Sequence, residues 1–248
     1  MRPALFLLSL LAYADSRLVS IGDRSLSIDC TGNPSKSTVI LLAGGGRTAA
    51  DWSKTQPSIS TFTRVCSYDR AGLGQSDKPA TPQTTAEIVT DLHALLKAAG
   101  EKPPYVLAGH SIAGIYARRF SDAFPNEVAA FLFVDSSHEE QFLRLHEVDP
   151  TGPNPGDLGG AFLVKPGQRL DWHTDHAVIV LAQGKTTPQP NLSAETNAAF
   201  ARIWNDLQHD LAKRSPQGQY RLAEQSGHFV HIDQPDLVIQ ALRELSAN

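Results

Sequence analysis

The pattern of apolar positions changes along the chain from alternating to continuous. Two alternating segments, Arg17 to Ile21 and Arg24 to Asp29, flank the dipeptide Gly22-Asp23, which is typical of an antiparallel hairpin. Further along, the apolar runs are uninterrupted, at Val39 to Leu42, Tyr105 to Ala108, Ala129 to Val134 and Ala177 to Ala182. Uninterrupted runs indicate strands that are buried on both faces, as in parallel sheets.

Segments with helical periodicity lie between these strands. The clearest is Thr84 to Ala99, where Thr84 and Glu87 form a capping-box pattern and Gly100 follows the last residue. Three others are predicted at Ile112 to Phe124, Ser193 to Leu211 and Leu237 to Leu245. Alternating strands and helices predict an α/β fold, a doubly wound and mostly parallel sheet that opens with the antiparallel hairpin.

The length and composition fit one such domain. The chain has 248 residues, of which 41% are hydrophobic and 19% charged, an ordinary globular balance. Residues 137 to 175 break the rhythm with several prolines and glycines. We interpret them as a short lid insertion over the carboxyl ends of the strands, where ligands of such sheets bind.

The charge balance restricts the class of partner. The 22 basic residues are scattered and outnumbered by 26 acidic ones, which gives a net charge of -4 and argues against nucleic-acid binding. A small-molecule substrate is therefore expected, and the oligomeric state is left open. His173 and His176 have a spacing that metal ligands use, but they lie in the insertion and are expected to face solvent.

The first residues predict export. Arg2 precedes an apolar run from Ala4 to Ala12, and Ala12-Tyr13-Ala14 has the small-x-small form of a cleavage site, so residues 1–14 are interpreted as a signal peptide of a periplasmic or secreted protein. The alternatives are a stray N-terminal helix or an over-extended start, which would leave the protein in the cytoplasm. The apolar run is too short for stable insertion across a membrane core of about 30 Å.

Cys30 and Cys66 are the two cysteines, and each falls in a predicted strand. If the protein is exported and the strands are neighbours, a disulfide is favoured. Otherwise both are buried thiols.

Ser111 is the candidate nucleophile. It lies in Gly109-His110-Ser111-Ile112-Ala113, directly after a predicted strand and before a predicted helix. A serine at such a sharp turn is pushed out of the fold, within reach of a base. A chance glycine-containing turn is the alternative, but the strand and helix around it favour a nucleophile elbow.

A nucleophilic serine requires a base and an acid that orients the base. His228 follows the last predicted strand and precedes the last helix, with His231 as its rival. Asp135 ends the strand before the insertion and is the expected acid, although a helix cap or a loop-fixing role would also explain it. After the next strand, the first carboxylate is Glu195, already inside a predicted helix.

The glycine-rich loop after Val39 to Leu42 supports two interpretations. In the first, the N–H groups of Gly45 and Ile112 form the oxyanion hole of a serine hydrolase. In the second, Gly44-x-Gly46-x-x-Ala49 and the later Asp69 form a dinucleotide fingerprint of an oxidoreductase. The second interpretation lacks its helix, because the segment from Arg47 to Gln56 is short, polar and stopped by Pro57.

Taken together, these motifs resemble the α/β-hydrolase superfamily, in particular small bacterial serine esterases with a short lid. The resemblance also includes Asp69 to Ser76, which is similar to that family's Asp-x-x-Gly-x-Gly-x-Ser turn and is expected to be structural. Ala43 departs from the family's usual histidine, and Ala113 from its usual glycine. The resemblance implies hydrolysis of a small ester, thioester or amide without a cofactor. A ligand-binding scaffold without turnover is the main alternative.

Overall fold

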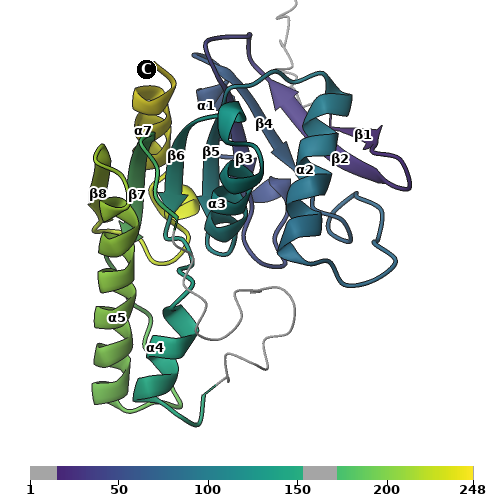
Figure 1. Ribbon diagram of the computed structural model, residues 1–248. Coiled ribbons are helices and arrows are strands. Elements are labelled where there is room, and N and C mark those ends of the chain that lie inside the picture. Colours follow the sequence, from purple (N-terminus) through teal and green to yellow (C-terminus); the bar gives the residue numbers. More distant parts are fainter. Residues whose placement is uncertain (1–15, 153–171, 248) are drawn as a thin grey trace, which may run out of the picture.

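The computed structural model describes residues 16–152 and 172–247, and its centre is one twisted sheet (Figure 1). In these residues the sheet has eight strands in the order β1-β2-β4-β3-β5-β6-β7-β8. Only β1 and β2 run antiparallel to their neighbours, which confirms a mostly parallel sheet that opens with a hairpin. The strands are β1 (Arg17–Ser20), β2 (Ser25–Thr31), β3 (Thr38–Leu42), β4 (Arg64–Tyr68), β5 (Tyr105–His110), β6 (Val128–Val134), β7 (Ala177–Gln183) and β8 (Gly218–Ala223).

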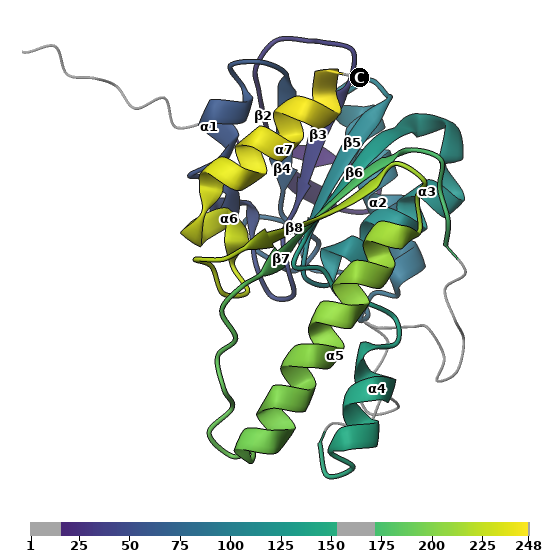
Figure 2. The same cartoon turned by 90° about the vertical axis from the view of Figure 1, so that its left-hand side faces the viewer.

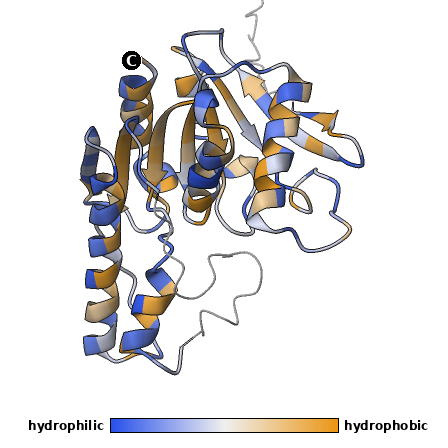
Figure 3. Cartoon of the chain, viewed as in Figure 1, coloured by the Kyte–Doolittle hydropathy of each residue, from blue (hydrophilic) through white to orange (hydrophobic). Residues whose placement is uncertain are grey.

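Helices cover both faces of the sheet, as the alternating pattern predicts (Figures 1 and 2). One buried apolar cluster joins the sheet to α2, α3 and α5, and a second joins it to α1 and α7. Figure 3 shows the strands in the middle of the sheet as strongly hydrophobic, whereas the edge strand β8 is mostly hydrophilic. The helices are α1 (Gln56–Ile59), α2 (Thr85–Ala99), α3 (Ala113–Ala123), α4 (Gln141–Val148), α5 (Ala194–Lys213), α6 (Val230–Asp233) and α7 (Pro235–Ala247), with 3-10 turns η1 (Ala49–Trp52) and η2 (Pro125–Glu127).

The sequence signals at helix ends have physical counterparts. The Thr84 side chain accepts from the Glu87 N–H, Glu87 bonds the Thr84 N–H in return, and Gly100 ends α2 with a φ of 83°. One detail differs, because Pro57 lies in the first turn of α1 and does not stop a helix. Proline is accommodated there since the first N–H groups of a helix have no partner within it.

The two cysteines join neighbouring strands. β2 and β4 pair antiparallel with Cys30 opposite Cys66, and a disulfide links them. Such bonds are typical of exported proteins, although the predicted signal peptide at residues 1–14 lies outside the described residues. None of the helices in the described residues is long and apolar enough to cross a membrane.

Part of the predicted insertion projects beyond the carboxyl ends of the strands. α4 and the first half of α5 extend together from that edge (Figures 1 and 2), while residues 153–171 lie outside the described residues. A buried ion cluster anchors the start of the insertion, since Glu139 bonds Arg118 of α3 at 2.7 Å and Arg214, just after α5, at 2.5 Å. The insertion therefore begins from a fixed base beside the sheet.

Candidate active site

Ser111 occupies a tight turn between β5 and α3. Its φ of 54° is in the left-handed region, which a residue with a side chain adopts only at a cost. A Cβ at Gly109 would lie 2.7 Å from the Ala113 carbonyl oxygen, so strand and helix approach too closely for any other residue. These two features make a nucleophile elbow, and Ala113 fits within it although the family commonly has glycine there.

Asp135 and His228, which are far apart in the sequence, are in direct contact. The His228 Nδ1–H donates to Asp135 Oδ2 at 2.6 Å. Asp135 is fully buried at the end of β6, and its Oδ1 also accepts from the Gln183 N–H at 2.9 Å and the Trp204 Nε1–H at 2.8 Å. Because the proton on Nδ1 is held by the carboxylate, Nε2 of His228 is left as the proton acceptor.

Ser111 lies close to this pair through its neighbour His110. The His110 Nε2–H donates to the His228 carbonyl oxygen at 3.0 Å, and the two imidazole centroids are 4.6 Å apart. Within residues 16–152 and 172–247, no hydrogen bond joins Ser111 to His228. The candidate acid Asp135 and the candidate base His228 are thus in contact, and the pairing of Ser111 with His228 stays a prediction.

The alternative candidates for the acid and the base, Glu195 and His231, lie away from Asp135. Glu195 is exposed in the first turn of α5. His231 is buried, with its Nε2 3.8 Å from Asp51 Oδ2 and its ring tilted against Trp52 at 4.5 Å between centroids. Burial lowers the pKa of His231 to about 4 and that of His110 to about 2, so both rings are neutral near pH 7. Among the histidines of residues 16–152 and 172–247, only His228 bonds Asp135.

Arg70 holds the glycine-rich loop that follows β3. Its guanidinium donates to the carbonyl oxygens of Ala43 and Gly44. Asp69, just before it, accepts from the backbone N–H groups of Ala49 at 2.8 Å and Gln75 at 3.0 Å. The carboxylate that a dinucleotide site would use is therefore committed to the backbone, in line with its predicted structural role.

Gly45 and Ile112 lie beside the serine with their N–H groups available. Both line a cavity of about 730 Å³ together with Ser111, which we call the Ser111 cavity. Among the described residues, neither backbone N–H donates a hydrogen bond outside helices and strands. A Cβ at Gly44 would lie 2.7 Å from His110 Nδ1, so this loop packs directly against the elbow. The arrangement can place two donors on a carbonyl oxygen bound at Ser111.

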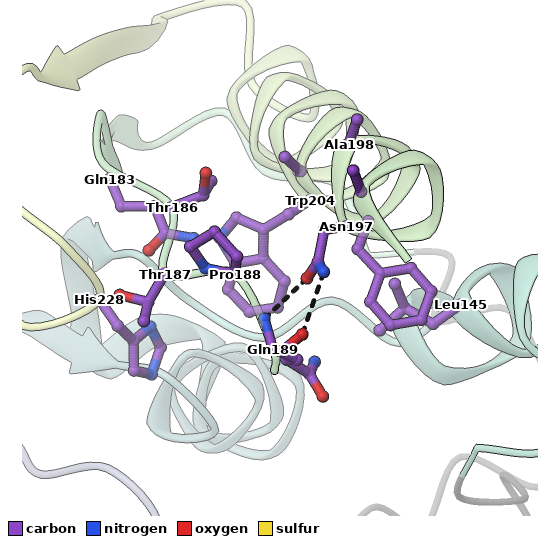
Figure 4. Close-up of a pocket in the computed structure, with 13 residues that line it drawn as sticks. Leu145, Gln183, Thr186, Thr187, Pro188, Gln189, Asn197, Ala198, Trp204 and His228 are labelled. Carbon is purple, nitrogen blue, oxygen red and sulfur yellow. Dashed lines mark hydrogen bonds between the residues drawn. The ribbon is translucent and has the colours of Figure 1, made fainter. Parts of the chain in front are cut away.

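A second cavity of about 610 Å³ is lined by His228, the loop after β7 and residues of α5 (Figure 4). We call it the His228 cavity. It is lined by Leu145, Gln183, Thr186, Thr187, Pro188, Gln189, Ala194, Asn197, Ala198, Phe200, Ala201, Trp204 and His228. Of these two cavities, the first is lined by Ser111 and the second by His228.

The described residues offer one buried group with the spacing of metal ligands near the site. Asp51, His110 and His231 have ligand atoms within 4.8 Å of one another. However, Arg47 bonds both oxygens of Asp51, at 2.6 and 2.7 Å, so a divalent cation would meet a positive charge. His173 and His176 belong to no such group in the described part of the chain. Both were expected to face solvent, but only His173 is exposed, whereas His176 is half-buried.

Sequence reasoning missed Trp204 and Arg70 as parts of the site. Trp204 fits the apolar stripe of α5, and only its contact with Asp135 identifies its second role. The indole N–H could have indicated this second role, because a half-buried indole N–H needs a hydrogen-bond acceptor. Arg70 follows Asp69 within the recognised turn motif, but nothing in that spacing indicates that it holds the glycine loop.

The described geometry agrees with a comparison against protein families. Residues 39–241 match the model of the alpha/beta hydrolase family. The chain belongs to this family. The match covers β3 through most of α7 and includes every candidate site residue discussed above.

Individual proteins resemble the chain at low sequence identity. The chain is 26% identical to the uncharacterized protein YqjL of Bacillus subtilis over 225 residues, 84% of this chain and 83% of that one. It is 30% identical over 163 residues to the "Probable transporter efuK" of Hormonema carpetanum, but this match covers 60% of this chain and only 23% of that much longer protein. Among solved structures, the carboxylesterase CesB of Bacillus subtilis is similar with a TM-score of 0.63 and 17% identity, covering 94% of this chain and 91% of the other.

Proposed function

We propose that this protein is a serine hydrolase that cleaves a small ester, thioester or amide through an acyl-enzyme. Ser111 is the nucleophile, His228 the general base and Asp135 the residue that holds the imidazole. The observation that carries the proposal is the 2.6 Å contact between His228 and the buried Asp135, next to a serine on a strained turn. Solved esterases of the same fold, such as the Bacillus carboxylesterase, support the reaction class.

In the first half of the reaction, Ser111 Oγ attacks the carbonyl carbon while His228 Nε2 takes the hydroxyl proton. The negative charge then develops on the carbonyl oxygen, which the Gly45 and Ile112 N–H groups stabilise by about 3 kcal/mol each. When the intermediate collapses, the bond to the leaving group breaks and His228 returns its proton to that group. The product is an acyl ester of Ser111.

In the second half, His228 takes a proton from water and the resulting hydroxide attacks the acyl carbon. The second tetrahedral intermediate expels Ser111 Oγ, which recovers its proton from His228. The carboxylic acid leaves and the serine is restored. Asp135 keeps the positive charge of the imidazolium compensated throughout, so no cofactor enters the scheme.

The nucleophile is tested by Ser111→Ala. We expect this variant to lose turnover of p-nitrophenyl acetate and covalent labelling by a fluorophosphonate, because both require the Oγ atom. The matched control is Ser58→Ala, which removes an exposed serine of α1 and should leave both readouts unchanged. Thermal unfolding of both variants should match the wild type.

The same test separates an enzyme from a scaffold that only binds a ligand. A wild-type protein that neither turns over the ester nor takes the label would support the scaffold. Wild-type turnover that persists in Ser111→Ala would remove the serine from the mechanism.

A further inference from the structure

The two cavities at the candidate site differ in which reacting group each contains. The Ser111 cavity contains the nucleophile together with Gly45 and Ile112. The His228 cavity contains the proposed base and no residue of the oxyanion hole. An ester bound at this site would therefore have one part near Ser111 and another part near His228.

The proton path decides which part goes where. The carbonyl oxygen must face the N–H groups in the Ser111 cavity, while the oxygen of the leaving group must reach His228 Nε2 to be protonated. In that arrangement, the leaving group would extend past His228 into the cavity beside α5. The acyl part stays on the side of Ser111.

We propose that the His228 cavity binds the leaving group and that the substrates are esters of neutral, apolar alcohols or phenols. This inference rests on the proposed function above. It adds a substrate class, which the reaction chemistry alone does not give.

The lining of the cavity supports a neutral and apolar occupant. Within the described part of the chain, none of the thirteen residues that line the cavity is an aspartate, glutamate, lysine or arginine. Leu145, Pro188, Phe200 and Trp204 supply the larger apolar surfaces. A charged group placed there would lose hydration without gaining an ionic partner. The volume of about 610 Å³ lies in the range of ordinary small-molecule sites.

One amide side chain in the wall, that of Asn197, already has its hydrogen-bond partners within the protein. The Asn197 side-chain oxygen accepts from the Gln189 N–H at 2.7 Å, and its amide N–H groups face the carbonyl oxygens of Gln189, Leu192 and Ser193 at 3.1, 3.2 and 3.0 Å. Figure 4 shows two of these bonds, between Asn197 and Gln189, which leave the amide directed at the loop. Asn197 therefore fixes the loop after β7 and is not free to recognise a polar ligand.

Trp204 connects this cavity to the proposed acid and base. Its Nε1–H is bonded to Asp135, which fixes the indole, and its ring lies edge-on to His228 at 5.9 Å between centroids and 75° between planes. The wall that contacts the leaving group is thus rigidly tied to the pair that protonates it. An apolar ring bound against Trp204 would have its oxygen next to His228.

The test fills the cavity and compares two esters of reversed orientation. Ala201 lines the cavity one helical turn before Trp204, so Ala201→Phe should reduce kcat/KM for 2-naphthyl acetate by about tenfold or more, as expected for steric exclusion from a pocket. Methyl 2-naphthoate, whose leaving group is methanol, should change by less than about twofold. The control is Ala199→Phe, on the same helix but outside the cavity lining, which should affect neither ester.

Ala198→Phe gives the same comparison at an exposed position of the cavity wall, in case the larger side chain at Ala201 prevents folding. A second pair of substrates tests charge. Phenyl acetate should be cleaved with a kcat/KM at least about tenfold above that of 4-carboxyphenyl acetate, because the carboxylate would lack a partner in the cavity.

The outcomes separate this inference from the proposed function. Loss of methyl 2-naphthoate turnover with 2-naphthyl acetate unaffected would place the acyl part in the His228 cavity and overturn the inference. Equal rates for both members of the charged pair would overturn its claim of a neutral leaving group. In either case, fluorophosphonate labelling of Ser111 would still support the serine hydrolase, whereas a wild type that takes no label would overturn both.

Discussion

Two aspartates follow the carboxyl ends of strands in the same sheet, Asp69 after β4 and Asp135 after β6. Both are buried, with exposures of 6% and 0%. Among the described residues, the Asp69 carboxylate accepts only from backbone N–H groups, those of Ala49 and Gln75. The Asp135 carboxylate accepts hydrogen bonds from the imidazole of His228, the indole of Trp204 and the backbone N–H of Gln183. Burial at a strand end therefore does not by itself mark a candidate acid, since the partners decide.

The partners also differ in their distance along the chain. The Asp69 carboxylate is enclosed by its own turn, where a Cβ at Gly74 would lie 2.0 Å from Oδ2. Its hydrogen bonds span 6 residues to Gln75 and 20 residues to Ala49. The contacts of Asp135 span 93 residues to His228 and 69 to Trp204, so they exist only when the whole sheet has assembled.

The strongest test of this contrast is Asp135→Asn. An amide at this position would favour the wrong imidazole tautomer, and serine triads lose about 10⁴ in kcat on such a change. We expect a loss of this size in the hydrolysis of p-nitrophenyl acetate, with far-UV circular dichroism unchanged. A comparable loss in Glu195→Gln or Asp206→Asn, without one in Asp135→Asn, would show that the acid lies on α5.

Asp69 and Asp135 also show which parts of the fold and the candidate site can be predicted from the sequence. The elbow around Ser111, the turn at Asp69 and the histidine before the last helix are local patterns, and each appears where it was predicted. The continuous apolar runs likewise predicted the parallel strands, because a strand buried on both faces needs apolar residues throughout. The resemblance to α/β-hydrolases, carried by these local motifs, agrees with the family match.

Contacts between distant segments could not be predicted in the same way. The register of β6 and β7 places Asp135 beside Gln183, and the packing of α5 places Trp204 on the carboxylate. Neither depends on a local pattern. The same limit applies to the His228 cavity, whose walls come from α4, the loop after β7 and α5. Periodicity identifies the apolar face of α5 but not which part of that face packs and which part lines a cavity.

A smaller loss of activity than for Asp135→Asn is expected for Trp204→Phe. The change removes the Nε1–H donor to Asp135 but keeps an aromatic wall, and a hydrogen bond to a charged group contributes about 1.5–3 kcal/mol. We expect kcat/KM for p-nitrophenyl acetate to fall about tenfold or somewhat more. Phe200→Leu, in the same cavity wall but without a bond to Asp135, is the matched control. If both variants lose activity equally, Trp204 acts only through packing.

The smallest effect on activity is expected for Asp69→Asn. The new NH₂ group would face a backbone N–H and leave one buried donor without an acceptor, which costs about 1–3 kcal/mol of stability. Urea unfolding should therefore shift to lower denaturant, while kcat changes by less than about threefold because no reacting group touches Asp69. Asp77→Asn, which alters an exposed carboxylate bonded to the Ser25 N–H, should destabilise less. A kcat loss in Asp69→Asn as large as that of Asp135→Asn, at unchanged stability, would mean that the turn takes part in catalysis and that backbone partners do not mark a structural aspartate.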